Sequence, residues 1–333
     1  MLNIIKKNKL PAITFLILSL FPFFIDSYYL NNISYFMCWT FISLGLALIW
    51  GMGGVLSFGQ TAFFGLAGYS FAVISINFIG TFGVGIWPVF AALLITTLFG
   101  FIVGYFLFYG GIYDVFIGIV TLAITLVLET YLQQTAGPEY AIGEARLNGF
   151  NGMQGMPTIG FQDLKFGLIE GVTQYYFILV LAIIALIFLY KFKASKLGLI
   201  FLASKEDRNR VASLGHNVQK VQLIAFVIAS LLAGISGILY TNWGGYITPS
   251  SMGLVSAALP VVWVAASGKN DFFAVFIGTV FLVWLSQTLA INGAQFAIIV
   301  MGLILVISTR FFPDGIILMV KNKLIEKIKW LQS

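Results

Sequence analysis

Apolar residues run along the chain in ten long stretches, which are separated by short segments rich in charge, Gly, Pro or Asn. Each stretch is about as long as the roughly 20 residues that a membrane-spanning helix needs. The pattern therefore predicts an all-α, polytopic membrane bundle of about ten transmembrane segments. They lie near residues 10–25, 33–50, 60–79, 86–109, 112–132, 174–191, 221–241, 252–267, 272–290 and 294–311.

The composition supports a membrane protein. Only 9% of the 333 residues are charged and 60% are hydrophobic, whereas soluble domains carry about 25% charged residues. Cys38 is the single cysteine, so a disulfide framework or a thiolate metal site is not available. The net charge of +6 does not indicate nucleic-acid binding, because the basic residues cluster at the ends of apolar stretches. The first stretch follows Lys9 and resembles a signal peptide, but no small-residue cleavage site follows, which favours an uncleaved helix.

The distribution of Lys and Arg predicts the orientation. If the N-terminus is cytoplasmic and ten spans alternate, 16 of the 18 basic residues fall on the inner side, and only Arg146 and Lys165 fall outside. Such a bias is typical of cytoplasmic loops. We therefore expect both termini in the cytoplasm and the bundle in contact with membrane lipid.

Two connections are long enough for a role of their own. The outer one, about residues 133–174, holds several acidic residues and would face an arriving solute. The inner one, about residues 191–220, is rich in charge, and its segment from Lys205 to Leu214 has the pattern of a short amphipathic helix. We expect this helix to lie outside the lipid as a docking surface.

Four glycines crowd into residues 51–59, between the second and third apolar stretches. Non-helical backbone at membrane depth occurs where it is buried in protein or lines a cavity. The segment therefore predicts a broken or re-entrant helix, with Gly53, Gly54, Ser57 and Gln60 near the translocation pathway. Tight helix packing through small residues is the alternative reading.

Few other residues suggest chemistry. Asp114 and Glu129 lie in or at the ends of the fifth apolar stretch, where a carboxylate is either part of the pathway or solvated at the interface. His216 is the single histidine, so a metal site of two or more histidines is not available. Because the chain contains no Gly-x-x-x-x-Gly-Lys-Ser/Thr motif, any ATP chemistry must belong to another subunit.

Three sequence blocks resemble the permease subunits of bacterial branched-chain amino acid ABC importers, a family that includes permeases for urea and short amides. The first block spans residues 51–65, around Leu56-Ser57-Phe58-Gly59-Gln60. The second spans residues 111–123 and is completed by Asn151-Gly152-Met153. The third spans residues 195–237, and Phe312-Pro313-Asp314-Gly315 follows near the end.

The resemblance implies one transmembrane permease domain, residues 1–333, in a bacterial plasma (inner) membrane. This domain would not be an enzyme and would hold no cofactor. Its partners would be cytoplasmic ATP-binding subunits, a second permease and an extracytoplasmic solute-binding protein. In this family the inner loop couples to the ATPase, which here implies the candidates Lys205, Glu206, Asp207, Arg208 and Gly215.

An ion-gradient-driven secondary transporter is the main alternative. It would require coupling carboxylates or cation sites at mid-membrane, and the chain offers only Asp114 and Glu129. A membrane-embedded enzyme is a weaker alternative, because no histidine pair, carboxylate pair or activated nucleophile stands out.

Overall fold

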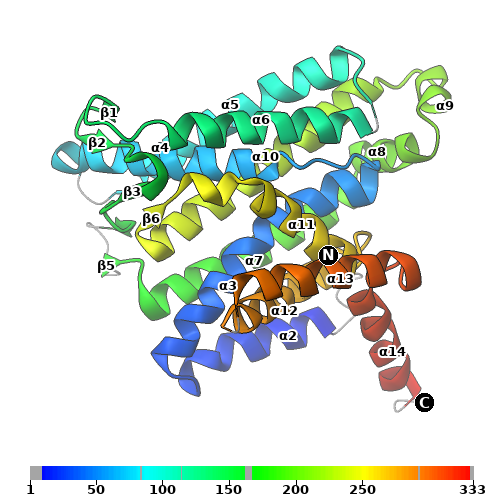
Figure 1. Cartoon of the computed structure of the whole chain (residues 1–333). Coiled ribbons are helices and arrows are strands. Elements are labelled where there is room, and N and C mark those ends of the chain that lie inside the picture. The colour runs from blue at the N-terminus through cyan, green and yellow to red at the C-terminus, as the bar shows by residue number, and fades with distance from the viewer. Residues whose placement is uncertain (1–9, 83–84, 114, 162–166, 292, 331–333) are drawn as a thin grey trace.

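The computed structural model describes residues 10–82, 85–113, 115–161, 167–291 and 293–330, and they form an elongated helical bundle (Figure 1). Seven described helices are long and apolar enough to cross a membrane, and a pair bent by 60°, Gln295–Phe311 with Ile316–Lys323, makes up to eight. Two shorter apolar helices are Leu10–Phe23 and Leu254–Ser267. The ten predicted apolar stretches all fall on these helices. The all-helical polytopic fold is therefore confirmed, with seven or eight full-length spans.

The described helices are α2 (Leu10–Leu20), α3 (Ser27–Leu46), α4 (Gln60–Phe82), α5 (Trp87–Tyr109), α6 (Val115–Gln133), α7 (Gly171–Ala194), α8 (Lys196–Glu206), α9 (Arg208–Ser213), α10 (Val218–Gly244), α11 (Leu254–Ser267), α12 (Phe272–Ala290), α13 (Ala294–Phe311) and α14 (Ile316–Trp330). Shorter helical turns are η1 (Phe21–Phe23), η2 (Ala47–Met52), η3 (Gly149–Asn151) and η4 (Pro249–Met252). The two-residue strands are β1 (Ala141–Ile142), β2 (Ala145–Arg146), β3 (Met153–Gln154), β4 (Gly160–Phe161), β5 (Gly167–Leu168) and β6 (Tyr246–Ile247).

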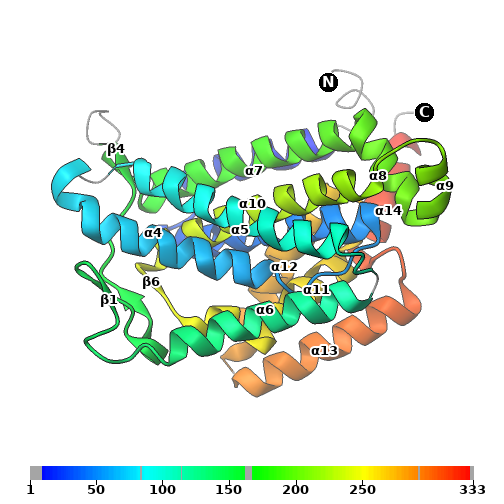
Figure 2. The ribbon, with the colours of Figure 1, turned by 90° about the horizontal axis from the view of Figure 1, so that it is seen from above.

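The bundle has two different ends, which we call the β-strand end and the α8–α9 end. The short strands gather at the first, and α8, α9 and α14 lie at the second (Figure 2). Strands β1 and β2 pair with each other, as do β4 and β5, whereas β3 pairs antiparallel with β6. The last pairing joins the predicted outer loop to the connection between α10 and α11.

Helix α10 is the centre of the core and packs against α3, α4 and α5. Glycines allow two of these approaches. A Cβ added to Gly237 would lie 2.0 Å from the backbone oxygen of Phe64, and one added to Gly45 would lie 2.8 Å from that of Ala229. Small residues at helix contacts are a common device in membranes, because they allow backbones to approach closely.

The chain is non-helical between α3 and α4, within the glycine-rich segment where the sequence predicted a break. Helix α3 continues into the π-helical turn η2, the backbone of residues 54–59 is non-helical, and α4 begins at Gln60. Gly54 has a φ of +72°, a conformation that glycine adopts without steric cost. We call residues 54–59 the glycine link. It lies at the α8–α9 end.

Candidate functional site at the α8–α9 end

Side-chain caps start the two short helices that define this end. The Ser195 side chain accepts a hydrogen bond from the Gly198 amide at 3.2 Å, and the Asp207 side chain accepts one from the Arg210 amide at 2.9 Å. Such caps satisfy amides that have no partner within the helix. Asp207, a predicted coupling residue, therefore fixes the turn between α8 and α9.

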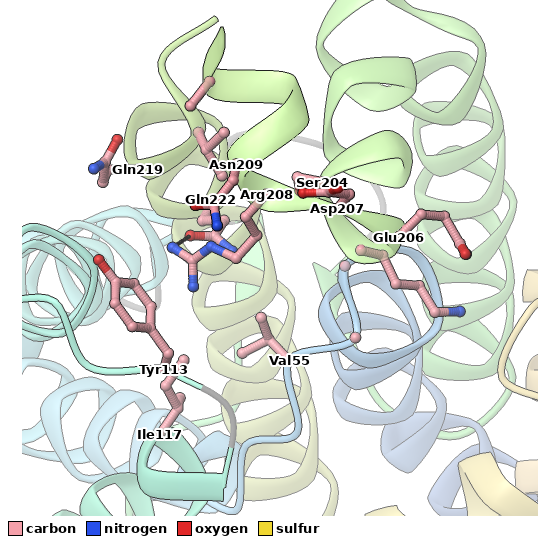
Figure 3. Close-up of a pocket in the computed structure, with 15 residues that line it drawn as sticks. Val55, Tyr113, Ile117, Ser204, Glu206, Asp207, Arg208, Asn209, Gln219 and Gln222 are labelled. Atoms are coloured by element: carbon pink, nitrogen blue, oxygen red, sulfur yellow. Dashed lines mark hydrogen bonds between the residues drawn. The ribbon is translucent and has the colours of Figure 1, made fainter.

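A cavity of about 510 Å³ lies between the glycine link and these two helices. We call it the α8–α9 cavity (Figure 3). The cavity brings together residues from two separate predictions. Gly53 and Gly54 were predicted to lie near the translocation pathway, and residues 205–208 were predicted to couple to the ATPase. Its lining consists of Gly53, Gly54, Val55, Tyr113, Ile117, Ser204, Lys205, Glu206, Asp207, Arg208, Asn209, Ala212, Val218, Gln219 and Gln222.

Helix α8 contacts the glycine-rich segment directly. The Lys205 amine donates a hydrogen bond to the backbone oxygen of Gly51 at 3.1 Å. A Cβ added to Gly53 would lie 2.0 Å from the buried ring of Phe201. Any side chain at residue 53 would therefore have to displace the buried Phe201 ring, and glycine allows this close approach.

Arg208 connects three parts of the chain. Its guanidinium donates a hydrogen bond to the Gln222 side-chain oxygen at 2.9 Å and lies 3.8 Å from the ring centroid of Tyr113. A cation placed over an aromatic face at this distance is attracted by the ring. Figure 3 shows Arg208 beside Gln222 and Tyr113, whereas the carboxylate of the exposed Glu206 points away from them. Arg208 thus holds α9 against α10 and the start of α6, and Glu206 remains on the surface.

Ser57 and Gln60 do not line this cavity, although they adjoin it in sequence. Both are 1% exposed, and the Ser57 hydroxyl accepts a hydrogen bond from the Gly59 amide. Neither polar atom of the Gln60 amide has a hydrogen-bond partner within the described part of the chain. Burying an unpaired amide is costly, so Gln60 marks a position that the packing of one chain does not satisfy.

The glycine link is attached to α6 by two hydroxyls. Thr121 accepts a hydrogen bond from the Phe58 amide at 3.2 Å, and Thr125 donates one to the Phe58 carbonyl at 3.4 Å. Both threonines are buried. A displacement of the link would therefore reach α6 as well as α4.

The structure separates the remaining candidates from this cavity. Glu129 lies farther along α6, where it accepts a hydrogen bond from the Gln133 side chain at 3.0 Å and lies close to Gly253. Gly215 and His216 are exposed in the turn between α9 and α10, and Gly215 has a φ of +83°. Asp114 lies outside the described residues.

A second contact at this end was missed by sequence reasoning. Lys269, in the connection between α11 and α12, lies 4.8 Å from the ring centroid of Trp50, and its backbone oxygen lies against Gly51. Burial lowers the pKa of the Lys269 amine, and the positive charge of Lys205 lowers it further, against an opposing effect of Asp314. Lys205 and Lys269 therefore both contact the helical turn η2 at Gly51.

Comparison with known proteins identifies the family. The model of the branched-chain amino acid transport system permease component matches residues 28–309. The chain is 26% identical to the high-affinity branched-chain amino acid transport system permease protein LivM of Escherichia coli K12, over 96% of this chain and 77% of that protein. It is 24% identical to the probable branched-chain amino acid transport permease protein LivM of Methanocaldococcus jannaschii, over 68% of this chain and 66% of that protein. No solved structure matches.

The matched region includes the glycine link, α8, α9 and every residue that lines the cavity. Membership of a permease family makes the protein a transport subunit rather than an enzyme. The chain therefore belongs to the family of permease components of branched-chain amino acid transport systems.

Proposed function

We propose that this permease imports branched-chain amino acids and is driven by ATP-binding subunits that dock on α8 and α9. A second permease subunit and an extracytoplasmic solute-binding protein complete the proposed complex. The observation that carries the proposal is the α8–α9 cavity, in which an exposed, charged helix pair meets the glycine link beside α4. The relatives named above supply the substrate class.

The basic residues support a cytoplasmic position for the α8–α9 end. Among the described residues, the lysines and arginines at this end lie in α7, α8, α9, the start of α10 and α14. The β-strand end carries Arg146. Cytoplasmic loops are enriched in Lys and Arg. In the proposed orientation, a solute-binding protein docks at the β-strand end.

The proposed transmission uses the contacts around the cavity. Exposed groups such as Glu206 meet the ATP-binding subunit, and Leu214, which is 72% exposed, adds an apolar contact at the tip. Movement of α8 reaches the glycine link through Lys205 and Phe201, and movement of α9 reaches α6 and α10 through Arg208. The link can respond because the backbone of its residues is not part of a helix.

Replacing Glu206 and Arg208 by alanine tests the coupling role. In proteoliposomes that contain the whole complex, we expect ATP hydrolysis to continue while uptake falls at least roughly tenfold, which corresponds to about 1.4 kcal/mol of coupling. Arg310→Ala with Asp314→Ala is the matched control, because it removes one positive and one negative charge at exposed positions that do not line the cavity. Uptake that equals wild type in the E206A/R208A variant would refute the coupling role.

Two further measurements address the substrate and the orientation. Radiolabelled leucine, isoleucine and valine should accumulate only with ATP and the binding protein, whereas urea and a short amide should not accumulate.

A cysteine at Ser213, in a Cys38→Ser background, tests the orientation. It should react with an impermeant maleimide only after the membrane is opened. Labelling of residue 213 from outside intact cells would reverse the orientation and remove the ATPase docking site.

A further inference from the structure

A groove of about 1000 Å³ runs along the outside of the bundle between the α2–α3 corner and α12. Its walls come from α2, from the segment between η1 and α3, from the first half of α3 and from α12. It lies away from the α8–α9 cavity, and none of its lining residues has a part in the proposed coupling.

Polarity changes along the groove in the same direction on both walls. On α3, Asn32 is partly exposed and Asp26, just before the helix, is exposed, whereas Phe36 and Met37 are buried. On α12, Gln287 and Thr288 are exposed, whereas Phe276 is buried. An amphiphile with a polar head and an apolar tail matches this gradient, whereas a uniformly apolar helix does not.

The dimensions match half a bilayer. The lining runs from Tyr28 to Met37 on α3 and from Phe276 to Thr288 on α12, which at 1.5 Å per residue is roughly 14 to 18 Å. One leaflet accounts for about 15 Å of a hydrocarbon core that is about 30 Å thick. Tyr28, Tyr29 and Trp284 are exposed along the groove, and Tyr and Trp are enriched at the level of lipid headgroups.

The α2 wall is held in place by the neighbouring helix α7. The hydroxyl of Tyr175 donates a hydrogen bond to the Leu18 carbonyl at 2.6 Å, and the hydroxyl of Tyr176 donates one to the Ser19 carbonyl at 3.0 Å. Phe15 packs on Phe276 at 5.4 Å between ring centroids. The groove is therefore preformed, and a ligand would not have to open it.

The charge of the groove determines which lipid headgroup it favours. Asp26 is the one charged residue among the described residues that line the groove, it is exposed, and its side chain forms no cap hydrogen bond with α3. We propose that this groove binds one phospholipid with a primary-amine headgroup, such as phosphatidylethanolamine, whose ammonium pairs with Asp26 and whose acyl chain lies between α3 and α12. An anionic headgroup would be repelled by the same carboxylate.

Native mass spectrometry of the complex in mild detergent, with equimolar phosphatidylethanolamine, phosphatidylcholine and phosphatidylglycerol, tests the proposal. We expect one phosphatidylethanolamine retained per chain, with a preference over phosphatidylglycerol of roughly threefold to fivefold, the size expected of an exposed ion pair. Asp26→Asn should abolish this preference. Glu170→Gln is the matched control, because Glu170 is also an exposed helix N-cap without a cap hydrogen bond, and it should leave the preference unchanged.

A groove-filling variant tests the acyl site separately from the headgroup. Val280→Trp should reduce retention of all three lipids, whereas Val73→Trp, in an uncharged groove beside α4, should not reduce phosphatidylethanolamine retention. If Val280→Trp does not fold, tryptophan fluorescence provides a second test, because Trp284 lines the groove. Brominated phosphatidylethanolamine should quench the tryptophan fluorescence of the wild-type protein more than that of the Trp284→Phe variant. Equal retention of the three headgroups by wild type, or cross-linking of a cysteine at residue 280 to another protein subunit, would overturn the proposal.

Discussion

The two ends of the bundle are held together in different ways. At the β-strand end, amide side chains bind backbone groups of the predicted outer loop. Asn242 accepts a hydrogen bond from the Ile159 amide at 2.7 Å and donates one to the Ile169 carbonyl, and Asn77 does the same for Glu144 and Ile142. At the α8–α9 end, a lysine, an arginine and an aromatic ring meet around a cavity.

This difference indicates which end can change shape. The Asn242 hydrogen bonds are buried, and buried hydrogen bonds cost free energy when broken, because both groups then lack partners. Contacts of long charged side chains beside an open cavity break at lower cost, since water replaces them. We therefore expect the β-strand end to be rigid and the α8–α9 end to adopt more than one arrangement.

The largest effect is expected from Gly53→Ala at the mobile end. The added Cβ would overlap the Phe201 ring, and overpacking of this kind costs about 1–3 kcal/mol. We expect thermal unfolding at lower temperature and a loss of most ATP-driven uptake. Adding Phe201→Ala should restore part of the uptake. Gly302→Ala, where nothing lies within 4 Å of the new Cβ, is the control, and an equal loss there would contradict the explanation.

A comparable loss of stability, with a smaller effect on uptake, is expected from Asn242→Ala at the rigid end. The variant leaves the Ile159 amide and the Ile169 carbonyl without their partner, which costs about 2 kcal/mol. Unfolding in denaturant and proteolysis within the outer loop measure the loss. Asn77→Ala should cost less, because its hydrogen bonds to the loop are exposed. If the two variants lost equal stability, burial would not explain the rigidity of this end.

Tyr113→Leu should have a modest effect. It removes the ring over which Arg208 lies, an interaction worth about 1 kcal/mol. We expect weaker coupling between ATP hydrolysis and uptake with little change in the temperature of unfolding. Tyr140→Leu, a partly exposed tyrosine at the other end, should change neither quantity. Normal coupling in Tyr113→Leu would show that Arg208 does not act through the ring.

The smallest effect concerns Lys269. Because the charge of Lys205 lowers the pKa of the Lys269 amine, Lys205→Met should raise that pKa. Carbon-13 NMR of reductively methylated lysines in the two proteins would measure the shift. A pKa that stayed constant or fell would mean that the two amines are not electrostatically coupled.

Hydrophobic pattern predicted the helices well because lipid enforces a simple rule, that a spanning segment is apolar over about 20 residues. The ends were less predictable. Helix α3 with η2 extends over residues 27–52, where the pattern predicted 33–50, because Tyr28, Tyr29, Asn31 and Asn32 are helical although they interrupt the apolar run.

The site was predicted only in its separate parts. Glycines at residues 53 and 54 marked a break, and charges at residues 205–208 marked a docking helix, but no local signal says that they meet across some 150 residues. Gln222 lies inside an apolar helix and Asn242 near the end of the same helix, and neither stands out without the partner that it binds. Whether the predicted residues act in transport stays a prediction that the variants above test.

Helix α4 begins where the glycine link ends, and on the far side Asn77 binds the backbone of the loop between β1 and β2. Its 23 residues give a rod of about 34 Å, so a tilt of roughly 5° about one end would shift the other by about 3 Å. In the proposed complex, a displacement of α8 by the ATP-binding subunit would therefore be transmitted to the docking face of the solute-binding protein through one rigid helix, α4.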